Sequence, residues 1–231
     1  MSFSGARMES TLDSWIELLH TATPFLIQGA GYTVFFALIS MVLGLALGFA
    51  VALVRIARVP VLAQIAAVYV SAMRGTPLLV QIFVIYYGLP SVGIEFEPVT
   101  AGILALTLNV AAYLSESMRG AIAGVSRNQW LAGYSLGLNW WQTMRHIIAP
   151  QALRLAVPSL SNSLISLIKD TSLVSVITVT ELMLATKEVI AQTFQPLPLY
   201  LAAAAIYWML SALFERVQRA VERKLEFAHR H

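Results

Sequence analysis

The chain has 231 residues, of which 58% are hydrophobic and only 12% are charged, and its formal net charge is +3. Soluble domains carry about 25% charged residues, so this composition excludes an ordinary water-exposed domain. The mean hydropathy of +0.73 fits a protein surrounded by lipid. Cysteine is absent, which excludes disulfide bonds, a thiol nucleophile and a thiolate metal site. We therefore expect an all-α membrane protein with one bundle of helices.

The N-terminal segment, residues 1–23, mixes charged with apolar side chains. It lacks the short apolar core and small-residue cleavage site of a signal peptide. Within it, Thr11–Leu19 is predicted to form a short amphipathic helix near a membrane surface. A transmembrane domain is expected over residues 24–216, and a basic cytoplasmic tail over residues 217–231.

Five apolar runs are predicted to cross the bilayer, because a helix needs about 20 apolar residues to span the hydrocarbon core. The runs cover residues 24–54, 60–89, 99–119, 155–179 and 199–214. The first contains Gly44 and Gly48 in a G-x-x-x-G pattern, which permits close helix packing. The stretch 181–198 is predicted to be a loop or a short helix.

The distribution of charge predicts how these runs are oriented. Cationic residues in short loops mark the cytoplasmic side of a membrane protein. Arginines follow the first run, fill the segment between the third and fourth runs, and recur in the tail after the fifth. The remaining connections carry Glu95 and Glu97, or Lys187 balanced by Glu188. Five spans with this alternation place the N-terminus outside and the C-terminus inside.

The cytoplasmic segment of residues 126–151 has the pattern of two short helices joined by a sharp turn. Ser126 and Gln129 have the spacing of a capping box, which predicts the start of the first helix. Gly137 can adopt the left-handed conformation that ends a helix. This segment is therefore predicted to contain a helix–glycine–helix hairpin.

The second helix of the hairpin is predicted to start at Asn139, a favourable N-cap residue, with Gln142 in the capping-box position. Pro150 is expected to close that helix and to start the next element. Trp140 and Trp141 follow the cap and are exposed unless a partner covers them. They indicate either a docking element, since aromatic anchors dominate interfaces, or a loop lying in the lipid interface, where aromatics also gather.

The hairpin also resembles the loop shared by importer-type ABC permeases, whose pattern is E-A-A, three residues, G, nine residues, I-x-L-P. The positions that align with this pattern are Leu131, Ala132, Gly133, Gly137, Ile147, Ala149 and Pro150. Further stretches resemble the polar amino-acid permeases of that superfamily: RGTPLLVQIF (74–83), YYGLP (86–90), PQALRLAVPSLSN (150–162) and IKDTSL (168–173). GAGYT (29–33) and YYGLPSVGIEFEP (86–98) look closest to the cystine permeases.

This resemblance implies an ATP-driven importer subunit that forms the translocation pathway in the bacterial cytoplasmic (inner) membrane. The expected partners are an ABC ATPase dimer, a second permease copy (this chain or a sibling), an extracytoplasmic amino-acid-binding protein and membrane lipid. The chain has no G-x-x-x-x-G-K-[ST] phosphate loop. We therefore expect no enzymatic activity and no cofactor in this chain, with ATP and Mg²⁺ bound by the partner ATPase.

Coupling to the ATPase is expected to pass through the hairpin, whose second helix lies in a groove of the ATPase in the resembled family. The residues assigned to this role are Leu131, Ala132, Gly133, Gly137, Leu138, Asn139, Trp140, Trp141, Met144, Ile147 and Pro150. Three positions depart from the family pattern: Leu131 replaces its glutamate, Gly133 its second alanine, and Ala149 a leucine. The loss of the acid at position 131 puts one polar contact in doubt.

Polar and charged residues inside the apolar runs are candidates for the substrate pathway, because a charge at the bilayer centre is costly and faces the bundle interior. They are Arg74, Asn109, Tyr113, Glu116, Asn162, Ser166, Lys169 and Asp170. Arg74 and Asp170 are predicted to lie at matching depth and to pair. The alternative role for each residue is hydrogen bonding between helices, which polar residues commonly supply in membrane bundles.

Two other classes of protein remain as alternatives. A self-sufficient secondary carrier or channel would need no ATPase, but the docking hairpin argues against it, and a single five-span unit lacks the paired repeats of many carriers. A membrane-embedded enzyme would have only Glu116 with His146 as a catalytic pair. The histidines show no metal-ligand spacing, and the basic tail fits the positive-inside rule better than nucleic-acid binding. Cystine is the first expected substrate, followed by basic amino acids and glutamine.

Overall fold

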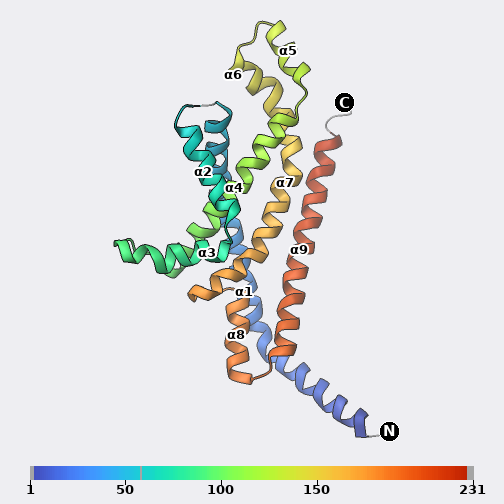
Figure 1. Ribbon diagram of the computed structural model, residues 1–231. Coiled ribbons are helices and arrows are strands. Elements are labelled where there is room, and N and C mark those ends of the chain that lie inside the picture. Colours follow the sequence, from blue (N-terminus) through green and yellow to red (C-terminus); the bar gives the residue numbers. More distant parts are fainter. Residues whose placement is uncertain (1–2, 58, 228–231) are drawn as a thin grey trace.

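The computed structural model describes residues 3–57 and 59–227, and the regular structure in these ranges is helical throughout (Figure 1). The elements are α1 (Phe3–Ile56), α2 (Leu62–Gly75), α3 (Leu78–Phe83), a π-helical turn (Val84–Gly88), a 3₁₀ helix (Leu89–Val92), α4 (Pro98–Gly124), α5 (Arg127–Ser135), α6 (Trp140–Thr143), a π-helical turn (Met144–Ile148), α7 (Ala149–Asp170), a 3₁₀ helix (Thr171–Ile177), α8 (Leu182–Thr193) and α9 (Pro196–Phe227). The predicted all-α class is confirmed.

Within the described ranges, three helices are long and apolar enough to cross a membrane: residues 13–56 of α1, all of α4, and residues 196–224 of α9. A bent pair, Leu62–Gly75 with Leu78–Val92, brings the number to four if the pair counts as one span. Helix α7, the predicted fourth span, is not among them. Its polar side chains, described below, lower its apolar character, so length and composition alone do not reach five spans.

The second apolar run, residues 60–89, is not one straight helix, because its two parts are bent by 111°. Thr76 is extended, with φ −121° and ψ 148°. Pro77 has no backbone N–H, and its ring disfavours a helical conformation at the preceding residue. Gln81 stabilises the break, since its Nε2 donates to the carbonyl oxygens of Met73 at 2.8 Å and of Thr76 at 3.2 Å.

The predicted amphipathic helix at Thr11–Leu19 is not a separate element, because α1 runs from Phe3 to Ile56. Pro24 lies inside this helix. A proline removes one helical hydrogen bond and bends a helix. The N-terminal part of α1 leans away from the bundle (Figure 1). The predicted stretch 181–198 contains the short helix α8.

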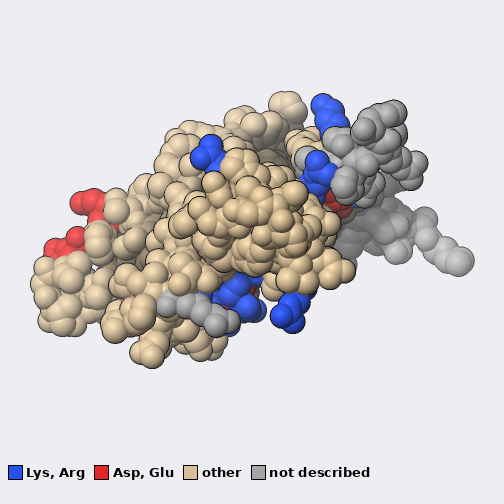
Figure 2. All heavy atoms as spheres, turned by 90° about the horizontal axis from the view of Figure 1, so that it is seen from above, with Lys and Arg blue, Asp and Glu red and all other residues tan. Residues whose placement is uncertain are grey.

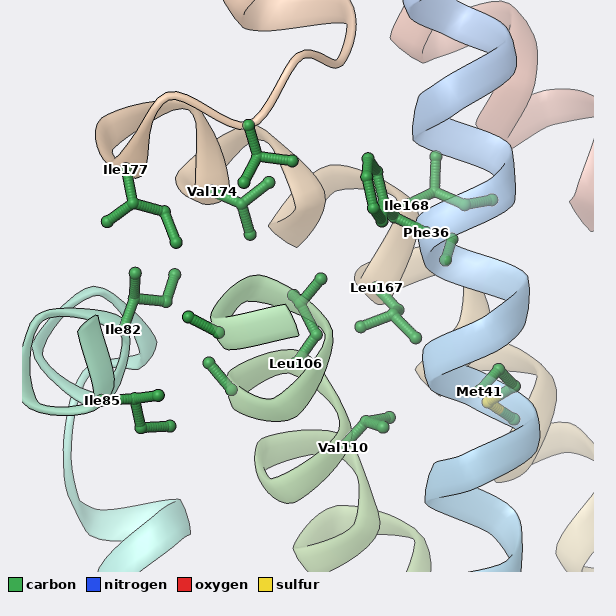
Figure 3. Close-up of a cluster of buried hydrophobic side chains, with 14 of the residues drawn as sticks. Phe36, Met41, Ile82, Ile85, Leu106, Val110, Leu167, Ile168, Val174 and Ile177 are labelled. Atoms are coloured by element: carbon green, nitrogen blue, oxygen red, sulfur yellow. The ribbon is translucent and has the colours of Figure 1, made fainter. Parts of the chain in front are cut away.

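Close approach of α1 to α4 builds the centre of the bundle. A Cβ atom at Gly48 would lie 2.8 Å from the carbonyl oxygen of Ala111, and one at Gly44 would lie 2.5 Å from Cγ1 of Val110. The G-x-x-x-G pattern therefore serves packing within the chain. Beside this contact lies a buried apolar cluster that joins α1, the broken span, α4, α7 and the following 3₁₀ helix (Figure 3). Its labelled members are Phe36, Met41, Ile82, Ile85, Leu106, Val110, Leu167, Ile168, Val174 and Ile177.

The hairpin formed by α5 and α6 projects beyond the bundle at one end (Figure 1). The C-terminal part of α9 lies at the same end, whereas α8 lies at the opposite end. This arrangement separates a cationic, hairpin-bearing end of the molecule from the end that carries α8.

Candidate functional site

The first helix of the hairpin begins as predicted, but with a simpler cap. The side chain of Ser126 accepts a hydrogen bond from the backbone N–H of Asn128 at 3.3 Å. The predicted capping box with Gln129 is not formed, because the side-chain oxygen of Gln129 accepts instead from Nε2 of Gln151 at 3.3 Å. This second contact ties α5 to the start of α7, so the cap function and the packing of the hairpin use different residues.

The turn between the two hairpin helices follows the sequence prediction closely. Gly137 is left-handed, with φ 76°, and its N–H and that of the next residue donate to carbonyl oxygens of α5. Asn139 and Gln142 form a complete capping box: the backbone N–H of Gln142 donates to Oδ1 of Asn139 at 3.0 Å, and that of Asn139 donates to Oε1 of Gln142 at 2.9 Å. Both predictions are confirmed.

The expectation that Pro150 closes the second helix is wrong. The backbone passes from α6 through the π-helical turn at Met144–Ile148 directly into α7, and Pro150 lies in the first turn of α7. The wider π turn before Pro150 accommodates the proline, which has no N–H to donate to the preceding turn. The second helix of the hairpin is consequently continuous with α7 through helical backbone.

The two hairpin helices are locked together by a glycine and a threonine. A Cβ atom at Gly133 would lie 2.6 Å from Cγ2 of Thr143 and 3.1 Å from Cδ1 of Ile147. Thr143 is fully buried. Its branched side chain occupies the space that an alanine methyl group would need. An alanine at position 133, as in the family pattern, would therefore collide with Thr143 in this chain.

We predict that the substitution Gly133→Ala loosens the hairpin. Overpacking costs about 1–3 kcal/mol, which outweighs the gain of about 1 kcal/mol in helix propensity. Amide hydrogen exchange across α5 and α6 should become faster, and the double variant Gly133→Ala/Thr143→Ala should return it toward the original rate. Gly120→Ala is the control, because no atom lies within 4 Å of its added Cβ. Equal or slower exchange in Gly133→Ala would contradict the lock.

The predicted coupling residues divide into a surface set and a packing set. Of the predicted residues, Trp141 is 63% exposed and Leu131 is also exposed; Leu136, a neighbour outside the predicted set, is 76% exposed. Trp140 is half-buried, with its ring 6.2 Å from that of Trp130, so only one of the two tryptophans is free to anchor a partner. Met144 is buried and the side chains of Leu138 and Ile147 are half-buried; Ala132, Asn139 and Pro150 are exposed. The exposed apolar side chains on a projecting hairpin are typical of an interaction surface.

A polar cavity of 560 Å³ lies between α4 and α7, beside the break in the second span. It brings together five of the eight predicted pathway residues, which lie on α4 and α7: Asn109, Tyr113, Asn162, Ser166 and Asp170. Thr76, Pro77, Leu78, Val110, Ser117, Ser159 and Ser163 complete its lining. Hydroxyl, amide and carboxyl groups in such a cavity can donate to a carboxylate and accept from an ammonium group.

Asn109 lines this cavity but is committed to other bonds. Its Nδ2 donates to the carbonyl oxygen of Met73 at 3.3 Å and to Oε1 of Gln81 at 3.0 Å. These contacts hold the broken span against α4. In the structure, Asn109 therefore takes the alternative role, which is hydrogen bonding between helices.

Glu116 does not line the cavity and instead forms the centre of an ionic cluster. Its carboxylate accepts hydrogen bonds from Arg55 of α1 and, at 2.7 Å, from Arg119 of α4. Nη1 of Arg74 lies 3.7 Å away, and the Arg74 guanidinium sits 5.4 Å from the centre of the Tyr113 ring. Three helices therefore converge on one carboxylate.

The predicted pairing of Arg74 with Asp170 is wrong. Arg74 lies in the last turn of α2, which packs against α4, and so meets Glu116. Asp170 ends α7 and has no salt bridge among the described residues. Matching depth in the bilayer does not determine on which side of a helix a side chain lies.

Lys169 faces away from the 560 Å³ cavity. It lines a second polar cavity of 380 Å³ between α7 and α9, together with Glu215, Gln218 and Arg219. Asn162 and Ser166 border both cavities. Lys169 and Asp170, although adjacent in sequence, therefore contribute to different surfaces of α7.

Sequence reasoning missed a buried carboxylate at Glu181, which is fully buried ahead of α8. Its oxygens accept from the hydroxyl groups of Tyr207 at 2.6 Å and Thr33 at 3.3 Å, and from the backbone N–H of Leu184 at 2.9 Å. This network joins α1, α8 and α9. An acid immediately before an apolar run is a helix-start signal, but its distant partners leave no local pattern.

The residues of the enzyme alternative do not form a catalytic pair. His146 is exposed, and its Nδ1 lies 2.9 Å from the carbonyl oxygen of Gln142, whereas Glu116 is bonded to arginines. No cluster of metal-ligating side chains occurs in the part of the chain that the structure describes.

Comparison with known proteins gives consistent results. The family model for the inner membrane component of binding-protein-dependent transport systems matches residues 41–227. A probable amino-acid ABC transporter permease of Bacillus subtilis (strain 168) is 42% identical over 206 residues, which cover 89% of this chain and 90% of that protein. An L-cystine transport system permease of the same organism is 42% identical over 213 residues, covering 92% and 91%.

Solved structures share the fold. A chain from the crystal structure of an amino acid ABC transporter with histidines matches with a TM-score of 0.86 and 32% identity, over 89% of this chain and 96% of that one. A methionine ABC transporter in an inward-facing conformation matches with a TM-score of 0.73 over 88% and 97%, at 18% identity, which supports the fold alone.

Proposed function

Because this chain belongs to the family of inner membrane components of binding-protein-dependent transport systems, we propose that it moves a polar amino acid, cystine in the first place, through the cavity beside α7. It is a permease subunit of an amino-acid ABC importer and an inner-membrane protein. The single observation that carries the proposed coupling is the continuity of the projecting hairpin with α7.

We propose that the hairpin docks on a separate ATPase and that α7 carries the movement to the substrate pathway. The hairpin projects beyond the bundle (Figure 1), and several of its apolar side chains are exposed. Helix α7 lines the polar cavities on its other end through Asn162 and Ser166. In this account a closing ATPase dimer, which binds ATP and Mg²⁺, rocks α7 against α4 and alternates access to the cavity.

The proposed topology has five spans, with α7 as the fourth, the N-terminus outside and the C-terminus inside. The hairpin and the basic end of α9 lie at the same end of the molecule (Figure 1), as the positive-inside rule requires. Five spans form a small bundle, and the polar cavities beside α7 have to be shielded from lipid by further protein. A second permease copy, of this chain or a sibling, is proposed to supply it, with a binding protein delivering substrate from outside.

The proposed substrate class follows from the cavity and the relatives. A zwitterionic amino acid needs donors for its carboxylate and acceptors for its ammonium group, and Tyr113, Asn162, Ser166 and Asp170 supply both. The similarity to a permease named for L-cystine transport supports cystine as the substrate of this chain. A glutamine transport permease of Escherichia coli (strain K12), 35% identical over 207 residues, keeps glutamine as the next candidate beside basic amino acids.

Purification in mild detergent from native membranes tests this function. We expect an ATPase to co-purify and to be identified by mass spectrometry. Truncating a central interface tryptophan costs about 2 kcal/mol or more, roughly 30-fold in affinity, so Trp141→Ala should release the ATPase. Trp208→Ala is the matched control, because Trp208 is 72% exposed but lies on α9. A permease that purifies alone would point to a secondary carrier.

A further inference from the structure

The hairpin is a cationic element without a single acidic residue. Residues 126–151 contain Arg127 and Arg145, and neither Asp nor Glu occurs in this range. The family pattern places a glutamate where this chain has Leu131. The departure therefore removes a negative charge that the family pattern places on this loop.

The two arginines are available to a partner. Arg127 is the first residue of α5, and Arg145 lies in the π-helical turn after α6. Both are exposed, and neither has a salt bridge in the ranges that the structure describes. This distinguishes them from Arg55 and Arg119, which both form salt bridges with Glu116.

The arginines accompany an exposed apolar surface. Leu131, Leu136 and Trp141 are 52%, 76% and 63% exposed. Figure 2 views the molecule from above, the end at which the hairpin lies in Figure 1. In that view the surface is mostly uncharged with scattered basic groups, and most of the visible acidic atoms lie at one far edge.

We propose that the hairpin selects an ATPase whose docking groove has an apolar floor, facing Leu131, Leu136 and Trp141, and a rim of Asp or Glu carboxylates, facing Arg127 and Arg145. This inference rests on the proposed function and adds the chemistry of its partner. Apolar anchors at the centre of an interface supply affinity, and rim charges of opposite sign guide the encounter and select among partners. Leu131 is suited to this floor, because a leucine needs no cation opposite it.

Association of the ATPase with the purified full-length permease in lipid-free detergent tests this proposal. The variant Arg127→Glu/Arg145→Glu should associate about tenfold or more slowly at low salt, and its rate should lose the salt dependence of the original protein. The control is Arg216→Glu/Lys224→Glu, which makes the same change in charge on exposed residues of α9 at the same end of the molecule. This control should associate at close to the original rate.

A second variant tests the floor of the groove. Leu131→Glu restores the acid of the family pattern, and it should weaken association several-fold, because the glutamate would be desolvated without a cation. Tighter association would show a basic groove and overturn the proposal. If Arg127→Glu/Arg145→Glu associates with the ATPase as fast as the original protein, the proposal is also overturned. This holds even if the variant binds anionic vesicles more weakly, because the arginines would then serve the membrane surface. If no ATPase associates with the original chain, the proposed function itself fails.

Discussion

Replacing Glu181 with alanine is expected to destabilise the protein severely. The substitution leaves the hydroxyl group of Tyr207 and the backbone N–H of Leu184 without acceptors, in a site where Glu181 is fully buried. Each buried donor that loses its partner costs about 1–3 kcal/mol, and the deleted side chain leaves a cavity as well. The free energy of unfolding should therefore fall by about 3 kcal/mol or more, and α8 should detach from α1 and α9.

Thermal unfolding of the purified protein in detergent measures this effect. Glu188→Ala is the matched control, because Glu188 is exposed on the same helix, and it should unfold close to the original temperature. Glu181→Gln keeps one acceptor oxygen and should fall between the two. Equal melting temperatures for the alanine variants at positions 181 and 188 would show that the network does not hold the three helices together.

The second large effect is expected from Glu116→Gln, which removes the charge shared by Arg55, Arg74 and Arg119. The Glu116 side chain is 18% exposed, so the several kcal/mol expected for a fully buried ion pair are reduced by solvent, to about 1–3 kcal/mol. Substrate uptake should fall strongly, because three guanidinium groups then repel one another where α1, α2 and α4 meet.

Transport kinetics distinguish a positioning role of Glu116 from a contact with substrate. A positioning role predicts lower stability and a lower maximal rate, with KM for the amino acid unchanged. A raised KM with unchanged stability would instead place Glu116 in the substrate site, and unchanged kinetics and stability would exclude both roles. Glu95→Gln serves as control, since Glu95 is exposed and makes no salt bridge among the described residues.

Features set by neighbouring residues could be predicted from the sequence. The all-α class, the left-handed turn at Gly137 and the capping box of Asn139 with Gln142 depend on contacts within a few residues, and the structure contains them. The predicted coupling residues fall on one hairpin for the same reason, since they are contiguous in the chain.

Features set by distant contacts could not be predicted. The partner of Arg74 depends on which face of α2 meets α4, and the burial of Glu181 depends on Tyr207 of α9 and Thr33 of α1. Pro77 lies inside an apolar run, but this signal does not distinguish a sharp break of 111° from a mild kink in a single span. The face of the helix on which a residue lies, and not its depth in the membrane, determines its partner.

We expect this permease to move an amino acid only when a partner ATPase drives it. The most direct test is uptake of labelled cystine by liposomes that contain the chain, with and without the co-purified ATPase, supplied with the extracytoplasmic binding protein. The account predicts uptake that requires both the ATPase and hydrolysable ATP, and that stops in the Trp141→Ala variant. Uptake by the chain alone, driven by an ion gradient without ATP, would contradict it.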